Sequence, residues 1–167
     1  MKELEPSDTH RLRAAEGWLG LGLPAEAAAE LDALSPSCQR HPDVLEVRWI
    51  LHAHSQRWDA ALAAARELVL ATPDRASGWL HRAYALRRAA GGGLTQAQAA
   101  LQPAAERFPK EPTIPFNLAC YACQLGQLDE ARNWMKRAMK VGGRDVIRQM
   151  ALADEGLKPL WSELAGS

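Results

Sequence analysis

The chain has 167 residues, and its 20 Lys and Arg residues are balanced by 20 Asp and Glu residues. A formal net charge of zero provides no global field that would attract nucleic acid or an anionic membrane surface, so we expect neither as a partner. The sequence contains 31 Ala and 23 Leu but only 12 Val, Ile and Thr together, a scarcity of sheet-favouring side chains that excludes a β-rich fold and predicts an all-α protein.

Four alanines recur along the chain at nearly constant spacing. Ala27, Ala61, Ala97 and Ala131 are separated by 34, 36 and 34 residues, and each follows a turn-like break near the start of an amphipathic stretch. Residues that end helices follow these alanines at a similar phase: Pro42, Pro73, Pro109 and Gly143. This pattern predicts four pairs of helices joined by short turns.

The expected helix pairs cover about residues 8–34, 43–72, 75–107 and 112–141, followed by a C-terminal pair of capping helices at about 144–165. A pair of amphipathic helices cannot bury its apolar stripe alone, so neighbouring pairs must stack, and small residues allow their axes to approach closely. We therefore expect one domain over residues 1–167, built as an α-α superhelix, or solenoid, with a cap over its last pair.

The fourth pair carries a family resemblance. Its segments Phe116–Tyr121 and Leu125–Ala131, followed by Met135 and Ala138, have the expected residue type at almost every position of a tetratricopeptide repeat. The third pair resembles the repeat with a longer turn at Gly91–Gly93, and the first two pairs are more degenerate. The segment Leu157–Trp161 resembles the closing segment of many bacterial proteins of this kind. The resemblance implies a bacterial, non-catalytic adaptor that binds a protein or peptide in a concave groove.

The first helix of each pair is expected to line that groove. Projecting one helical stripe per pair gives a surface that is more apolar than solvent exposure requires, flanked by charges suited to an amphipathic guest. The candidate partner-binding residues are Leu12, Glu16, Glu46, Ile50, His54, Leu80, Tyr84, Arg87, Arg88, Phe116, Cys120 and Gln124. An equally weighted alternative is that the second helices or the termini of this protein cover some of these side chains.

Two other functions remain open at this point. Chains of this size with such repeats include dedicated chaperones for a single secreted bacterial protein, so the resemblance also allows that function. An apolar stripe could instead pair two copies into a homodimer that closes its own groove.

Since no apolar run approaches the ~18 residues of a spanning helix and the N-terminus lacks the apolar centre of a signal peptide, we expect a cytoplasmic protein.

Sites for metals, cofactors and catalysis find little support in the sequence. Cys120 and Cys123 form a Cys-x-x-Cys pair, but no second pair completes a zinc site, so we interpret them as apolar filling. The chain is expected to need no metal and no cofactor and to be no enzyme.

A basic stretch in the last quarter is most simply a solvated face, although it would also suit an acidic partner. It comprises Arg132, Lys136, Arg137, Lys140, Arg144 and Arg148.

Overall fold

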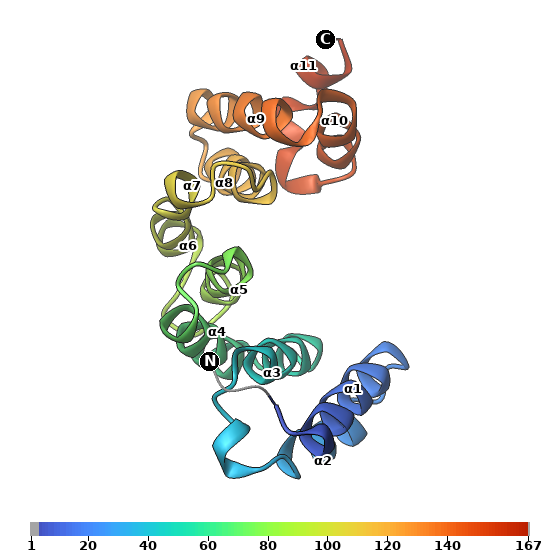
Figure 1. Cartoon of the computed structure of the whole chain (residues 1–167). Coiled ribbons are helices and arrows are strands. Elements are labelled where there is room, and N and C mark those ends of the chain that lie inside the picture. The colour runs from blue at the N-terminus through green and yellow to red at the C-terminus, as the bar shows by residue number, and fades with distance from the viewer. Residues whose placement is uncertain (1–3, 167) are drawn as a thin grey trace. The chain divides into compact units, whose positions relative to one another are not determined.

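The computed structural model describes residues 4–166, and in this range every regular element is a helix. The α-helices are α1 (Pro6–Gly20), α2 (Pro24–Asp32), α3 (Pro42–His54), α4 (Trp58–Ala71), α5 (Ala76–Leu86), α6 (Leu94–Leu101), α7 (Ala104–Arg107), α8 (Thr113–Gln124), α9 (Leu128–Gly142), α10 (Arg144–Leu152) and α11 (Trp161–Ala165). Two 3-10 helices, η1 (Pro36–Cys38) and η2 (Glu155–Leu160), complete the order (Figure 1). The predicted all-α fold is confirmed.

Contacts along the backbone divide the chain into two compact units, Met1–Gly91 and Gly92–Ser167. The boundary falls inside the glycine-rich turn that was expected to join the two helices of the third pair. Each unit is described below by itself, and the organisation of residues 1–167 as one domain stays a prediction. No helix within residues 4–166 is both long enough and apolar enough to cross a bilayer.

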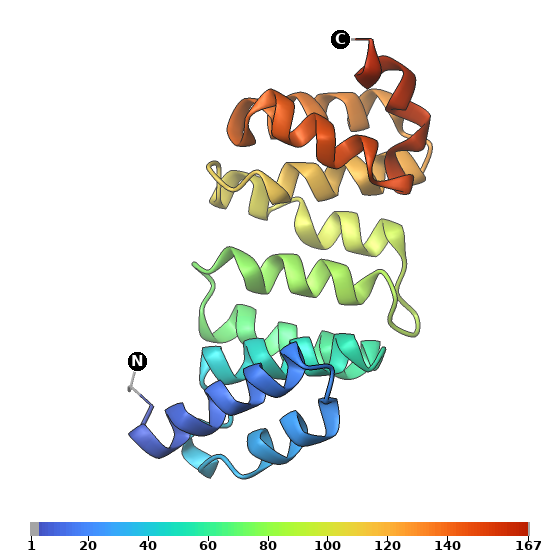
Figure 2. The same ribbon diagram turned by 90° about the vertical axis from the view of Figure 1, so that its right-hand side faces the viewer.

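The first unit contains two antiparallel helix pairs, α1 with α2 and α3 with α4, followed by α5, which packs on α4 (Figures 1 and 2). Ala27 of α2 and Ala61 of α4 are fully buried, as the small-residue pattern predicted. Proline occupies the first turn of α1, α2 and α3, where its missing N–H costs no helical hydrogen bond.

The turns between paired helices explain where the helices end. Gly22 between α1 and α2 has φ +73°, and Gly126 between α8 and α9 has φ +76°. Glycine is favoured in this left-handed conformation because it has no Cβ. The chain can therefore reverse within a few residues and lay the second helix against the first.

The second unit is built around α8, most of which is buried. Helix α9 packs along one side of α8, α6 contacts it as well, and η2 folds back onto it. The marker alanines Ala97 and Ala131 are fully buried here too. The C-terminal segment, which was expected to form a cap, thus covers α8 through η2 and covers α9 through α10.

Candidate functional site

The first helices of the pairs in the first unit, α1, α3 and α5, lie next to one another, since α3 contacts both α1 and α5. Nine of the predicted binding residues lie on these helices or directly after α5, and all of them except Leu12 are exposed or half-exposed. Glu46 is half-exposed but is held in a network with its neighbours, and it is described separately below. The other seven residues, which we call the first-helix face, are Glu16, Ile50, His54, Leu80, Tyr84, Arg87 and Arg88.

Tyr84 is the exposed member of a row of aromatic rings from three helices. Its ring makes an edge contact with Trp49 of α3, with centroids 6.0 Å apart, and a tilted contact with Trp58 of α4 at 5.9 Å. On the far side, His81 stacks on Trp49 at 3.7 Å. We call His81, Trp49, Tyr84 and Trp58 the aromatic row. Because its neighbours hold it, Tyr84 presents a pre-positioned ring with 38% of the residue exposed.

A cation lies over the exposed end of the aromatic row. The guanidinium carbon of Arg88 is 3.7 Å from the ring centroid of Tyr84 and 5.1 Å from that of Trp58. Arg88 Nη1 also donates a hydrogen bond of 3.1 Å to the carbonyl oxygen of Tyr84. The aromatic surface is therefore bordered by a fixed positive charge.

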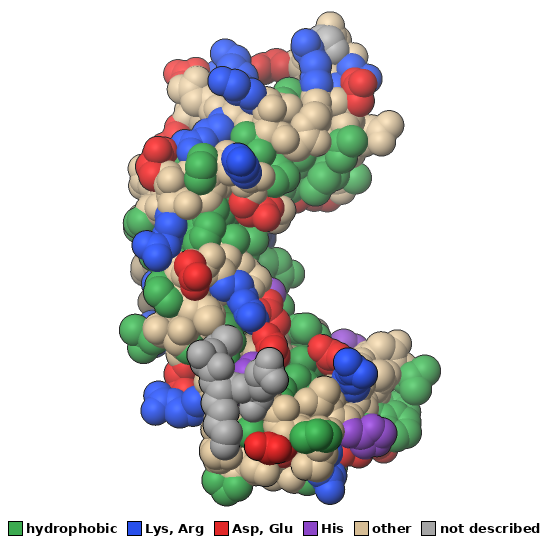
Figure 3. Space-filling model, viewed as in Figure 1, with side chains coloured by type: hydrophobic (Ala, Val, Ile, Leu, Met, Phe, Trp, Pro, Cys, Tyr) green, Lys and Arg blue, Asp and Glu red, His purple; other side chains and the backbone are tan. Residues whose placement is uncertain are grey.

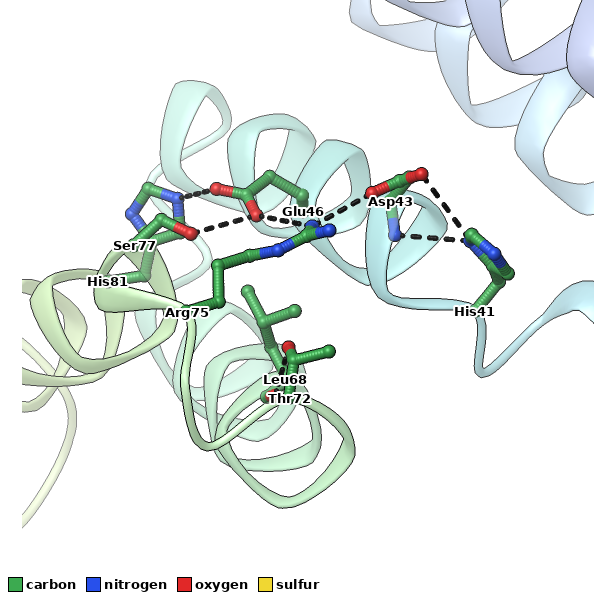
Figure 4. A network of polar contacts seen from close by, with 8 residues as sticks. All are labelled: His41, Asp43, Glu46, Leu68, Thr72, Arg75, Ser77 and His81. Atoms are coloured by element: carbon green, nitrogen blue, oxygen red, sulfur yellow. Dashed lines mark hydrogen bonds and ion pairs between the residues drawn. The ribbon is translucent and has the colours of Figure 1, made fainter. Parts of the chain in front are cut away.

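The carboxylate of Glu46 is already engaged by residues of α5 and the turn before it (Figure 4). Glu46 Oε2 accepts hydrogen bonds from Ser77 Oγ at 3.0 Å and Arg75 Nη1 at 3.4 Å, and Glu46 Oε1 lies 2.8 Å from His81 Nε2. Arg75 Nη1 also bonds to Asp43 Oδ1 at 2.8 Å. Glu46 thus joins α3 to α5, the two helices that carry Ile50 and Tyr84.

These contacts also change the acidity of Glu46. Burial alone would raise the pKa of this carboxyl group, but the hydrogen bond and charge of His81, together with Ser77 and Arg75, hold its pKa below the ordinary value. The group is therefore ionised at neutral pH. Its negative charge is compensated by Arg75 and the hydrogen bonds of Ser77 and His81.

Three other predicted binding residues lie in the interior. Leu12 is 6% exposed and packs in the core formed by α1, α2 and α3. Phe116 and Cys120 of α8 are 6% and 4% exposed. Gln124 is exposed at the end of α8, and its Nε2 approaches Gly156 of η2 so closely that an added Cβ there would clash with it.

The folded-back C-terminal segment explains the burial on α8. Helix η2 contacts α8, and Cys120 Sγ lies 3.5 Å from Asp154 Oδ2, just before η2. The stripe of α8 that was predicted to face a groove is therefore occupied in part by this protein's own chain. This is the alternative that the sequence left open for some members of the groove.

Two residues of α3, Trp49 and Arg48, differ in type from what the repeat pattern leads one to expect. Trp49 stands where a small residue is usual, and it forms the centre of the aromatic row. Arg48 stands where an apolar residue is usual, and its Nη2 donates to the carbonyl oxygen of Leu31 at 3.1 Å and to Gln39. Departures from the repeat pattern thus mark both residues, although the pattern gives no indication of their contacts.

The cysteines are free thiols, and Cys38, Cys120 and Cys123 are all buried. Burial raises the pKa of the Cys123 thiol, which disfavours the reactive thiolate. Within residues 4–166, no group of three or more His, Cys, Asp and Glu side chains is arranged to hold a metal ion.

Comparison with solved structures identifies the fold. A thermophilic TPR protein of Thermus thermophilus, TTC0263, matches 94% of this chain and 82% of its own, with a TM-score of 0.71 and 20% sequence identity. The chain has the tetratricopeptide-repeat fold. The MamA RS-1 ArsTM double mutant matches 83% of this chain and 77% of its own, with a TM-score of 0.70 and 16% identity. No protein-family model matches the sequence, and no curated protein matches it either.

Proposed function

We propose that this tetratricopeptide-repeat chain is a non-catalytic protein-interaction module that binds a peptide or helical segment of a partner protein on the first-helix face. The observation that carries the proposal is the exposed apolar pair Ile50 and Tyr84, 40% and 38% exposed on the adjacent helices α3 and α5. Solvated apolar side chains held in fixed positions are the usual anchors of protein interfaces.

The charges around these anchors indicate the chemistry of the guest. The negative charge of Glu46 is compensated by its neighbours. Arg88 borders Tyr84 with a guanidinium that has N–H donors beyond the one bonded to the Tyr84 carbonyl oxygen. Arg87 adds a second cation beside it. An amphipathic segment with acidic side chains next to its apolar ones would complement this surface.

The alternatives differ in the identity of the guest. A dedicated chaperone would bind one secreted substrate protein, and a homodimer would bury the first-helix face against a second copy. All three functions share the same anchors, so the partner recovered on those anchors distinguishes them.

The proposal is tested by affinity purification from native lysate, with circular dichroism confirming equal helix content. The wild type is compared with an Ile50→Ser, Tyr84→Ala double variant and with a Leu70→Ser control. Leu70 is 81% exposed on α4 of the same unit, outside the first-helix face. A protein recovered by the wild type and the control but lost with the double variant supports the proposal. Recovery of the same protein by all three contradicts it.

A further inference from the structure

A separate cleft lies within the second unit, between α9 and the C-terminal elements. It has a volume of about 300 Å³, and its floor is formed by Met135 and Met139 of α9 with Leu160 and Leu164. Met135, Leu160 and Leu164 are buried, and Met139 is half-buried. Methionine side chains adapt their shape readily, which suits an apolar site that accepts a side chain from another molecule.

The lengths of the two flanking helices explain why the cleft is open. Helix α9 has 15 residues, whereas α11 has only five. Arg132 at the start of α9 binds Glu163 of α11 through two hydrogen bonds, Nη2 to Oε1 at 2.7 Å and Nε to Oε2 at 2.9 Å. This ion pair connects α11 to the first turns of α9, and Met139, farther along α9, is half-buried.

The rim of the cleft is positively charged. Glu163 is paired with Arg132, so the acidic group of the wall is already compensated. Lys136 and Arg144 also line the cleft and are exposed, and neither forms an ion pair with any residue in the described range 4–166. In Figure 3, Lys and Arg side chains gather beside hydrophobic ones over the α9 part of the second unit.

We propose that this cleft is a second docking site, which binds an acidic amphipathic segment of a partner protein. An apolar side chain of the segment contacts Met139 and the buried floor, and Asp or Glu side chains next to it pair with Lys136 and Arg144. The charge of the rim selects acidic segments over basic ones. The site belongs to the second unit and does not depend on the function proposed for the first-helix face.

The test uses the intact protein and two fluorescent amphipathic peptides of about 15 residues, near the length at which an isolated helix is marginally stable. Both carry Leu at positions i, i+3, i+4 and i+7; the first has Glu at its polar positions and the second has Lys there. Fluorescence anisotropy is expected to show about tenfold tighter binding of the Glu peptide, as two exposed ion pairs would give. Equal binding of the two peptides would overturn the proposal.

Charge reversal locates the site. A Lys136→Glu, Arg144→Glu double variant is expected to reverse the preference in favour of the Lys peptide. A Lys110→Glu, Lys140→Glu double variant makes the same change in net charge at exposed cations that line a different hollow, and it is expected to keep the preference for Glu. If the second pair of substitutions reverses the preference and the first does not, the site lies elsewhere and the proposal is wrong.

The apolar floor is tested at its accessible member. Met139→Glu is expected to abolish binding of the Glu peptide, whereas Met139→Leu keeps it, and unchanged binding by Met139→Glu contradicts the proposal.

Sedimentation velocity tests whether a second copy of this chain, instead of a partner protein, occupies the cleft. If the wild type dimerises and the Lys136→Glu, Arg144→Glu variant is monomeric, a second copy fills the cleft and the proposed partner chemistry is overturned.

Discussion

The imidazole of His81 stacks on the indole of Trp49, with ring centroids 3.7 Å apart and 11° between the ring planes. The same imidazole lies 2.8 Å from the carboxylate of Glu46. One side chain of α5 thus connects the polar network of Glu46 with the aromatic row that presents Tyr84. The contribution of this network to folding stability and the role of the surface in binding can be tested separately.

Replacing Glu46 by Gln should destabilise the first unit by about 1–2 kcal/mol, because a half-buried network loses its negative acceptor. The pKa of Glu46 is lowered in the folded protein, so its contribution is present above the ordinary carboxyl pKa and is lost as the pH falls through the lowered value. Urea denaturation at neutral and acidic pH measures the effect. Glu16→Gln, an exposed carboxylate on α1, is the control and should change stability little.

Asp8 provides a second pH-dependent contribution. It is 2% exposed, and its pKa is lowered chiefly by the backbone N–H of Ser35, which donates to Oδ1 at 2.9 Å. Ionised Asp8 therefore stabilises the fold at pH values above the ordinary aspartate pKa of 3.8. This stabilisation is lost as the pH falls through the lowered pKa of Asp8. Asp8→Asn should lower the urea midpoint at neutral pH, and the difference should disappear in acid. Asp74→Asn, at an exposed position, is the control and should leave the urea midpoint nearly unchanged.

Phe116 and Tyr84 should behave differently when truncated to Ala. Phe116 is buried, so Phe116→Ala leaves a cavity and should cost about 3–5 kcal/mol of unfolding free energy. Tyr84→Ala removes two ring contacts at a partly exposed site and should cost less, about 1–2.5 kcal/mol. Urea denaturation compares the two variants. Equal costs would show that Phe116 is not part of the core or that Tyr84 is.

The repeat pattern predicted which alanines would be buried, because small residues recur where helices cross. All four marker alanines are fully buried, as a small residue at a helix crossing must be. The burial of Phe116 could not be predicted in the same way. Helical periodicity assigns a side chain to a face of its own helix, but it does not say which distant segment covers that face. Here η2, about 40 residues later in the chain, packs on α8.

The same limit applies to the polar part of the site. The sequence placed Glu46 and Tyr84 on one surface, but the partners of Glu46 come from residues 75–81, about 30 residues away. Likewise, the carboxylate of Asp8 reaches Ser35 and Cys38 across a helix pair. Such hydrogen bonds depend on tertiary positions, for which a single sequence carries no periodic signal.

The central claim, that a partner docks on the first-helix face, is tested most directly by site-specific photocrosslinking in cells. A benzoylphenylalanine residue is placed at Tyr84 in one variant and, as a control, at Leu70 in another. The account predicts a light-dependent adduct with a discrete protein partner from position 84 and none with that partner from position 70. Adducts with that partner from position 70 alone, or no adduct from position 84 with a partner that co-purifies, would contradict it.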